Sequence, residues 1–410
     1  MDYKIIEVTN KKTEKEFYKI QTTLYKGDPN WIQPLKTEIK KVFDPNKNKM
    51  FTHGKLIRWI AKDSNGKTVG RVAAFIDYDT AELNDQPTGG MGFFECINNQ
   101  NAANALFDQC KMWLSMNGMQ AMDGSINFGS RERWWGLLVD GFTEPSYGMN
   151  YNPPYYKDLF ETYGFKNYFY QYSYLRPVNT DNLAPVFKDK AERVAKNPEY
   201  HFAHINKKKL KEAGENFRKI YNKSWVNHSG IKEMTEEEAN ALVKELKPII
   251  DERLILFAYH NNEPIGFFIQ IPEINQVIKH LNGNFSLFHK LKFLYLLKVK
   301  KVCTRIIGLI FAIVPEYRGF GLEGALVMEF AKTAFNKNFP YKDIDLTWVG
   351  DFNPLMMRFQ EQIGGRIYKT HATYRLLFDK EKQENGFTRC PRMGKERKPK
   401  QDTGNLTVDS

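Results

Sequence analysis

The second half of the chain shows two hydrophobic periodicities, one typical of helices and one typical of strands. Apolar residues recur every three or four positions over 207–223 and 235–251, which predicts two amphipathic helices. Short apolar runs between turn residues predict strands, and two more helical segments lie among them. This order of elements predicts a mixed α/β sandwich. The predicted strands are 254–259, 264–271, 306–314, 345–348 and 367–377, and the further helices are 324–336 and 354–362.

Two short sequence motifs, a turn before a strand and an Asn-Pro helix start, each occur twice along the chain. The turn sequence GKTVG ends at Gly70, and NEPIG ends at Gly266. Asn-Pro begins a helical stretch that ends at Gly164, and Asn-Pro begins another that ends at Gly364, as helix caps require. The spacing from Gly70 to Gly164 is 94 residues, and that from Gly266 to Gly364 is 98. Equal order at nearly equal spacing predicts a tandem duplication.

The duplication divides the chain into two halves, 1–177 and 200–378. Residues 178–199 are rich in charge, Asn and Pro, and are predicted to form a connector with some helix. Residues 379–410 are dominated by Lys, Arg, Glu, Pro and Gly, and are predicted to be a disordered tail.

The composition is that of a globular protein with a basic surface. Of the 410 residues, 42% are apolar and 26% charged, which excludes a disordered chain, a collagen-like fibre and a multi-span membrane protein. The net charge of +12 favours an anionic partner: a polyanion, an anionic membrane or a phosphorylated small molecule.

The cysteines and the N-terminal residues indicate the cellular compartment of the protein. None of the four cysteines is spaced for a disulfide framework or a zinc site, so no metal is expected. The N-terminal segment has no apolar core of a signal peptide, and the longest uncharged apolar run, 306–314, is too short for a bilayer span. These features predict a reducing, cytoplasmic setting.

The most specific motif is the glycine-rich turn after the predicted strand 306–314. Its spacing G-x-G-x-x-G also fits a dinucleotide fingerprint, but no βαβ unit ending in an acid follows it. A pyrophosphate site for coenzyme A fits better, because glycines admit phosphate oxygens and the helix start offers unpaired N–H groups. A plain strand-to-helix turn is the remaining alternative. The motif consists of Arg318, Gly319, Phe320, Gly321, Leu322, Glu323 and Gly324.

This phrase resembles the Q/R-x-x-G-x-G/A motif of the GNAT acyltransferase superfamily. The resemblance implies an acyl-CoA or acetyl-CoA co-substrate, with main-chain groups near Ile313 and Val314 on the thioester and Asn353 at a position that often contacts the cofactor. Two residues depart from the family pattern. Glu323 places a carboxylate where phosphate should approach, and Gln360 occupies the place where many members carry a tyrosine acid.

The first half has a GNAT-like ending at Gly164-Phe165, but no R-x-x-G-x-G phrase. It resembles a degenerate GNAT-like domain, so one cofactor site is expected. Several phrases, including DPNWIQPL at 28–35, YNPPYY at 151–156 and PEINQ at 272–276, resemble the tandem-GNAT group that includes bacterial ceramide synthases. The resemblance covers residues 5–378.

Aminolysis of a thioester needs a base for the amine and an acid for the leaving thiol. Glu273 ends a predicted central strand and is the favoured base; a solvated acid at a strand end is the alternative. Asn275 is predicted to bind substrate or to cap the following turn. Possible acids are Tyr317, Tyr368 and Tyr374, and possible cleft residues of the first half are Asn127 and Arg131.

Residues 274–305 contain seven Lys or Arg, no Asp or Glu, and a block of apolar residues. The segment 285–301 is predicted to be an interfacial helix on an anionic membrane. The alternative is an insertion packed on the core with its lysines turned outward. No nucleic acid partner is expected, because the aromatic residues form one apolar block.

These features together predict an acyl-CoA-dependent N-acyltransferase that acylates a long-chain, sphingoid-type amine, in the cytoplasm or at the inner face of the membrane. Two alternatives stay open: N-acetylation of a small amine or a peptide N-terminus, and a non-catalytic acyl-CoA or lipid-binding protein.

Overall fold

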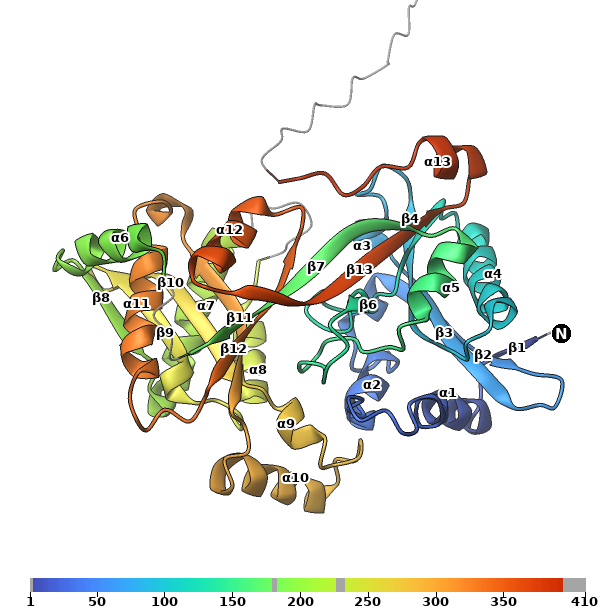
Figure 1. Ribbon diagram of the computed structural model, residues 1–410, viewed down its shortest axis with the longest axis horizontal. Helices are drawn as coiled ribbons and strands as arrows, with labels where there is room; N and C mark the ends of the chain where they lie inside the picture. Colours follow the sequence, from blue (N-terminus) through green and yellow to red (C-terminus); the bar gives the residue numbers. More distant parts are fainter. Residues whose placement is uncertain (1–2, 179–182, 226–232, 394–410) are drawn as a thin grey trace, which may run out of the picture.

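A computed structural model describes residues 3–178, 183–225 and 233–393 of the chain. In these residues one mixed sheet of 13 strands runs through the molecule, in the order β1-β2-β3-β4-β5-β13-β7-β12-β11-β10-β9-β8, with β6 paired to β13 (Figure 1). The α/β fold class predicted from the sequence is confirmed.

The N-terminal half contributes the first seven strands. Its elements are β1 (Lys4–Glu7), α1 (Lys11–Leu24), α2 (Lys36–Val42), β2 (Gly54–Lys62), β3 (Thr68–Asp77), α3 (Tyr78–Ala81), β4 (Thr88–Cys96), α4 (Gln100–Met116), β5 (Ala121–Gly124), β6 (Leu137–Asp140), α5 (Tyr156–Tyr163) and β7 (Lys166–Pro177).

The remaining elements are α6 (Pro185–Ala195), β8 (Tyr200–His204), α7 (Leu210–Trp225), α8 (Glu236–Leu246), β9 (Ile255–His260), β10 (Glu263–Pro272), α9 (Asn275–Ile278), α10 (Leu287–Leu294), β11 (Arg305–Ile313), α11 (Leu322–Ala334), β12 (Asp343–Gly350), α12 (Pro354–Gln362), β13 (Arg366–Leu377) and α13 (Lys380–Asn385). Every helix and strand predicted for this half is present within a few residues. The predicted helix 235–251 stops at Leu246 because Pro248 cannot continue it.

The two halves exchange their last strands. β13 of the C-terminal half pairs with β5 of the N-terminal half, and β7 of the N-terminal half pairs with β12. β7 and β13 pair with each other at the centre of the sheet, where Figure 1 shows them side by side. Each half of the sheet is therefore completed by the other half of the sequence.

The hydrophobic cores follow this exchange. Ala372, Tyr374 and Leu376 of β13 are buried in the N-terminal core with α4 and α5. Tyr174 of β7 is buried in the C-terminal core, which joins the sheet to α11. On the opposite face of β9–β11, α7 packs with a smaller core that includes Ile269 and Ile310.

The segment 379–410 was predicted to be a disordered tail, and this is wrong for its first part. Residues Lys380–Asn385 form α13, and buried Gln383 binds the main chain at Leu377 and Gly164. Further on, Cys390 N–H donates to the carbonyl of Tyr168 at 2.9 Å. A charged composition did not reveal these main-chain contacts. Residues 394–410 lie outside the described part.

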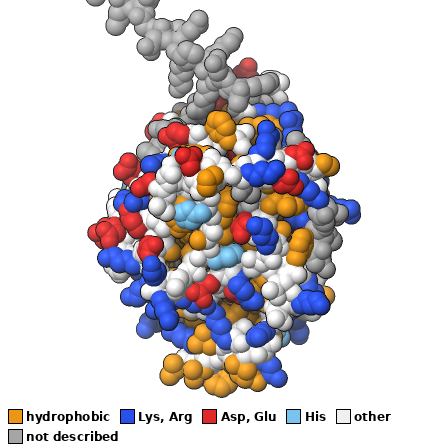
Figure 2. All heavy atoms as spheres, turned by 90° about the vertical axis from the view of Figure 1, so that its left-hand side faces the viewer, with side chains coloured by type: hydrophobic (Ala, Val, Ile, Leu, Met, Phe, Trp, Pro, Cys, Tyr) orange, Lys and Arg blue, Asp and Glu red, His pale blue; other side chains and the backbone are white. Residues whose placement is uncertain are grey.

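α10 and the π-turn that follows it, Tyr295–Val299, lie at the lower edge of the molecule in Figure 1. Leu287, Phe288 and Leu291 are 75%, 70% and 61% exposed there. Figure 2 shows hydrophobic side chains gathered at this lower end, with Lys and Arg side chains around them. Within the described residues, no helix combines the length and the apolar character needed to cross a bilayer.

Candidate active site

β11 and β12 run parallel but stay paired over only part of their length. Their register joins Arg305–Gly308 to residues 343–346, and no pair follows Gly308 and Leu346. Opposite β10, the register shifts by one residue at Leu309, a β-bulge that bends β11. Beyond this point the facing edges of the two strands form no ladder pair with each other, and we call this unpaired stretch the gap. Unpaired strand edges suit an extended chain that makes strand-like hydrogen bonds.

The predicted phosphate turn lies at the open end of this gap. Gly319 and Gly321 have φ angles of +81° and +97°, a region that favours glycine, and α11 begins directly after them. The first turn of a helix leaves N–H groups without intrahelical partners, and these attract anions. The main chain from Gly319 to Gly324 therefore suits a pyrophosphate.

The side chains of this turn bind the protein itself. Arg318 donates to the carbonyl oxygens of Ile313 at 2.9 Å and Ser224 at 3.2 Å. Glu323 accepts from the Gly319 N–H at 3.3 Å, while Phe320 is exposed. A bound phosphate would have to displace the Glu323 carboxylate from this N–H group.

Two other predicted cofactor contacts have structural partners. The Val314 N–H donates to the carbonyl of Ile265 at 2.9 Å and is used within the sheet. Asn353 accepts from the Met356 N–H at 3.2 Å, so it caps α12 as its place in the sequence required.

The corresponding gap in the N-terminal half is filled. β4 and β5 pair over Thr88–Gly90, and the chain after β5 then crosses β4, with the Ile126 N–H donating to Met91 O at 2.8 Å. A Cβ atom at Gly92 would lie 1.7 Å from the carbonyl oxygen of Ile126. The backbone itself thus takes the space that is open beside β11. This contact supports the prediction of one cofactor site.

Glu273 lies at the other end of β11 from the phosphate turn. Its main-chain N–H donates to the carbonyl of Arg305, the first residue of β11. A strand of nine residues spans about 30 Å, so the turn and Glu273 are far apart. Both carboxylate oxygens of Glu273 accept from the Tyr147 N–H at 3.1 Å, and Oε1 also accepts from the Asn275 N–H at 2.8 Å.

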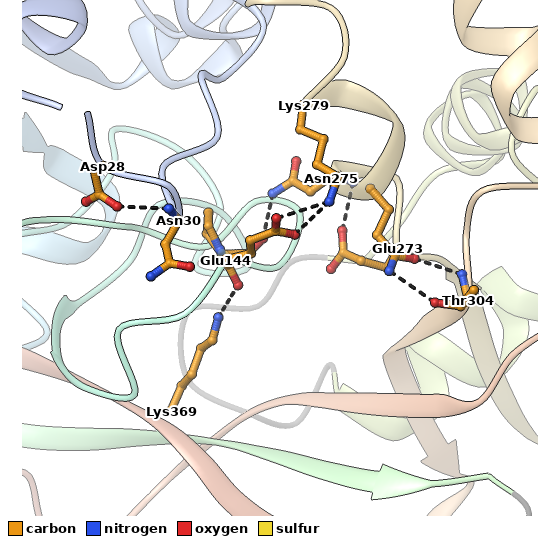
Figure 3. Close-up of polar contacts among 10 residues, drawn as sticks. Asp28, Asn30, Glu144, Glu273, Asn275, Lys279, Thr304 and Lys369 are labelled. Atoms are coloured by element: carbon orange, nitrogen blue, oxygen red, sulfur yellow. Dashed lines mark hydrogen bonds and ion pairs between the residues drawn. The ribbon is translucent and has the colours of Figure 1, made fainter. Parts of the chain in front are cut away.

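These contacts belong to a larger set around residues 143–150 of the N-terminal half, which we name the strap. Lys369 donates to the carbonyl oxygens of Thr143 and Glu144, and Asn275 donates to that of Pro145 at 2.8 Å. Figure 3 shows Glu144 between Lys369 and Lys279, and its carboxylate is 3.0 Å from the Lys279 ammonium. His371 Nε2 lies 3.0 Å from the carbonyl oxygen of Asn150. The C-terminal half thus holds a segment of the N-terminal half against its own polar residues.

Beneath the strap lies a second buried acid, Asp345 of β12. Its Oδ2 accepts from the Tyr368 hydroxyl at 2.5 Å and from the Ser146 hydroxyl. Burial raises the pKa of Glu273 to about 8, and the nearby Asp345 charge adds to that rise. Burial also raises the pKa of Asp345 and lowers that of Lys369 to about 8. The site therefore holds one acid, Glu273, and one lysine, Lys369, whose pKa values of about 8 lie close to neutral pH.

Sequence reasoning missed Asp345, Lys369 and Ser146. Asp345 and Lys369 alternate with apolar residues along their strands, a pattern that predicts a solvent-facing position. The strap, from the other half of the chain, contacts both side chains and helps to bury them.

Of the other residues singled out, Tyr374 is in the N-terminal core, where it donates to Glu161 at 2.8 Å. Tyr317 contacts His260 near the glycine turn, and buried Asn127 lies in the N-terminal half.

The strap also borders a cavity of about 70 Å³ that both halves line. Its walls include Glu38, Arg71, Glu95, Tyr147, Asn275 and Ile278.

Comparison with known proteins agrees with this architecture. No family model matches the chain. A solved tandem GNAT protein of the clavulanic acid biosynthesis pathway superposes with a TM-score of 0.53 at 9% identity, over 92% of this chain and 99% of that one. The likeness extends over both halves of the chain and shows the tandem-GNAT fold, as the sequence predicted.

Two curated proteins are similar to this chain in sequence over nearly its whole length. The chain is 28% identical to bacterial ceramide synthase of Caulobacter vibrioides (strain NA1000 / CB15N) over 382 residues, 91% of this chain and 97% of the relative. It is also 28% identical to protein YghO of Escherichia coli (strain K12) over 369 residues, 89% and 93% of the two chains.

Replacement of Gly321 by alanine tests the phosphate turn. A left-handed backbone costs a non-glycine residue about 1–2 kcal/mol, so the turn should change shape and acyl-CoA affinity should fall about tenfold. The measurement is calorimetric titration with acyl-CoA. Gly66→Ala is the matched control, because Gly66 has a φ of +74° in a hairpin far along the chain. Equal affinities of both variants and the wild type would contradict the assignment.

Proposed function

We propose that the protein transfers the acyl group of an acyl-CoA to the amino group of a long-chain, sphingoid-type amine. The observation that carries the proposal is that one half of the molecule combines the unpaired edges of β11 and β12 with an exposed apolar helix. The nearly full-length likeness to a bacterial ceramide synthase supports the same substrate class.

In this proposal acyl-CoA lies along β11. Its pyrophosphate would be held by the turn Arg318–Gly324 and by the start of α11, and its thioester arm by the facing edges of β11 and β12. Ile313 is the last residue of β11 and would border this gap. Its carbonyl oxygen accepts a hydrogen bond from the Arg318 side chain. Glu323 must turn away from the Gly319 N–H for the phosphate to bind.

The amine would arrive from the other end of the sheet. α10 follows α9, and Ile278 of α9 lines the cavity beside the strap. Insertion of α10 into an anionic membrane would place this cavity next to the lipid. Glu273 and Asn275 hold the strap at this place, and their contacts favour a positioning role; general-base catalysis by Glu273 stays a prediction.

The acylation itself is tested with the purified full-length chain, a long-chain acyl-CoA and a long-chain 2-amino-1,3-diol. Mass spectrometry should detect the N-acyl product, and free thiol should appear in equal amount. Acetyl-CoA with small amines and peptide N-termini serves as the comparison. Faster turnover of the small acceptors would contradict the lipid assignment.

A non-catalytic acyl-CoA or lipid-binding protein is the second candidate. The contact of Glu323 with the Gly319 N–H favours it, because this carboxylate occupies the phosphate turn. Acyl-CoA binding without any acyl transfer, together with an unchanged lipid profile in a deletion strain, would support this candidate over the first.

Substitution of serine for Leu287, Phe288 and Leu291 together tests the membrane contact. Burial of each such side chain contributes about 1.5–3 kcal/mol, so vesicle affinity should fall more than 100-fold. Cosedimentation with vesicles of phosphatidylglycerol and phosphatidylcholine measures it, and added salt should weaken wild-type binding through the lysines. Met116→Ser is the control, because Met116 is equally exposed on α4. Undiminished binding by the triple variant would rule out this surface.

A further inference from the structure

Asp345 has a carboxylate oxygen that nothing in the described structure binds. The residue is fully buried, and its Oδ1 has no hydrogen-bond partner among the described residues. Its Oδ2, in contrast, accepts from Tyr368 at 2.5 Å and from Ser146. The two hydroxyls therefore fix the carboxylate and leave one oxygen available.

The position of Asp345 relates this oxygen to the thioester gap. Leu346, the next residue, belongs to the last pair of β11 and β12 before the strands part. Ile344 and Leu346 pack toward α11, so the side chain of Asp345 projects from the opposite face. The strap covers this face through Ser146. Asp345 thus lies at the inner end of the gap, on the side away from α11.

The Asp345 carboxylate has cationic side chains in its neighbourhood but no close ion-pair partner among the described residues. Lys369 and Arg305 are close enough to stabilise its anion, and the Asp345 charge in turn helps to raise the pKa of Glu273. The Lys369 ammonium is taken up by the carbonyl oxygens of Thr143 and Glu144, and the Arg305 guanidinium lies 3.9 Å from Asp343. Among the described residues, no cation lies within 4 Å of the Asp345 carboxylate. A buried carboxylate without a close cation is costly, and an ammonium ligand would remove that cost.

A path for such a ligand leads from the cavity beside the strap. Pro145 and Tyr147, on either side of Ser146, line this cavity together with Glu38 and Glu95. The cavity wall therefore carries acids, and Ser146, which lies between two residues of this wall, donates to Asp345. A small movement of the strap would join the two spaces.

We propose that Asp345 is the catalytic residue that receives the acceptor amine: its Oδ1 binds the ammonium group of the long-chain amine and takes one proton from it. This inference rests on the proposed acylation. The neutral amine then attacks the thioester carbonyl, the C–N bond forms and the C–S bond breaks. The second proton lost by the nitrogen goes to the departing thiolate, which leaves as CoA thiol, and Asp345 passes the first proton to solvent.

Asp345 suits this role better than Glu273 because of their contacts. Two main-chain N–H groups, those of Tyr147 and Asn275, donate to the Glu273 carboxylate, whereas Asp345 keeps Oδ1 free. Tyr368 and Ser146 act as positioning residues that hold Oδ2.

The test compares Asp345→Asn with Asp343→Asn, a half-buried acid on the same strand, in the full-length protein. For Asp345→Asn, kcat/KM for the long-chain amine should fall at least 100-fold, and acyl-CoA affinity should stay within twofold. The acidic limb of the wild-type pH–rate profile should disappear. Asp343→Asn should stay within twofold of the wild type throughout. Turnover of Asp345→Asn within threefold of the wild type, or an equal loss of acyl-CoA affinity, would overturn the inference.

Two further measurements separate other causes. If Asp345→Asn fails to fold, Tyr368→Phe takes its place and should raise the KM for the amine about tenfold without a change in acyl-CoA affinity; an unchanged KM overturns the inference. If the wild type acylates no amine, the proposed function fails by itself. Calorimetric binding of a long-chain 2-amino-1,3-diol then decides about Asp345: loss of binding in Asp345→Asn supports the site, and equal binding overturns it.

Discussion

Glu273→Gln is expected to lower the turnover of amine acylation about 100-fold while acyl-CoA affinity stays within twofold of the wild type. A glutamine keeps one acceptor oxygen but turns an NH2 group toward the N–H donors of Tyr147 and Asn275. A buried N–H donor left without its acceptor costs about 1–3 kcal/mol, and 1.4 kcal/mol corresponds to tenfold. The strap should therefore shift away from Asp345. The phosphate turn lies at the opposite end of β11 and should be unaffected.

The pH–rate profile shows which role Glu273 has. Its folded pKa of about 8 lies above the ordinary value of 4.5, so a rate that depends on its carboxylate rises with pH until about pH 8. A positioning residue leaves this shape unchanged when replaced, and only the height of the profile falls. We expect the second result for Glu273→Gln. Glu263→Gln, at the exposed start of β10, is the control. Unchanged activity of Glu273→Gln would remove Glu273 from the mechanism.

The raised pKa also predicts how stability changes with pH. Folded Glu273 holds its proton up to about pH 8, whereas the unfolded chain releases it near 4.5. The native state therefore binds more protons between these values, and this group makes the free energy of unfolding fall as pH rises from about 4.5 to 8. Glu273→Gln should lack this part of the decline, which thermal unfolding across that pH range measures.

The second large effect concerns the exchanged strands. A chain of residues 1–180 alone is expected not to fold, because its core lacks Ala372, Tyr374 and Leu376 of β13. Each buried large side chain contributes about 1.5–3 kcal/mol, and β13 also supplies a full ladder of hydrogen bonds to β5. These losses are comparable with the whole stability of a domain, about 5–15 kcal/mol.

Coexpression gives the matched control. Chains of residues 1–180 and 181–410 made together should form a one-to-one complex with the circular dichroism spectrum of the intact protein, because each chain supplies the strand that the other lacks. A cooperative unfolding transition of 1–180 on its own would contradict the expectation. The division of the chain into the domains 1–177 and 200–378 stays a prediction, and this experiment decides whether each can fold on its own.

Much of the fold was accessible from the sequence because local patterns carry it. The apolar run of β11, the glycine turn and the Asn-Pro start of α12 are each readable within a few residues, since strand burial, positive φ angles and helix caps restrict the local residue types. The repeat and the family resemblance followed from the same short phrases. The exposed face of α10 was predicted by its apolar residues between lysines.

The candidate site was predicted only in part. The sequence singled out the glycine turn and Glu273 as candidates, but it does not show that nine residues of strand separate them. Lys369 and Asp345 looked like outward residues of amphipathic strands. They are buried because the strap, more than 190 positions away in sequence, lies across them. Contacts of this separation leave no local pattern.

By itself, the sequence determined that this is a tandem α/β protein with one glycine-rich strand-to-helix turn and one apolar, cationic segment, because these properties depend on neighbouring residues. Only the tertiary structure decided that the halves exchange β7 and β13, that backbone fills the gap beside β4, and that Asp345 keeps a free oxygen under the strap. Each of these depends on which distant segments meet. The N-terminal half has no phosphate turn, yet it supplies the strap that closes the polar site of the other half.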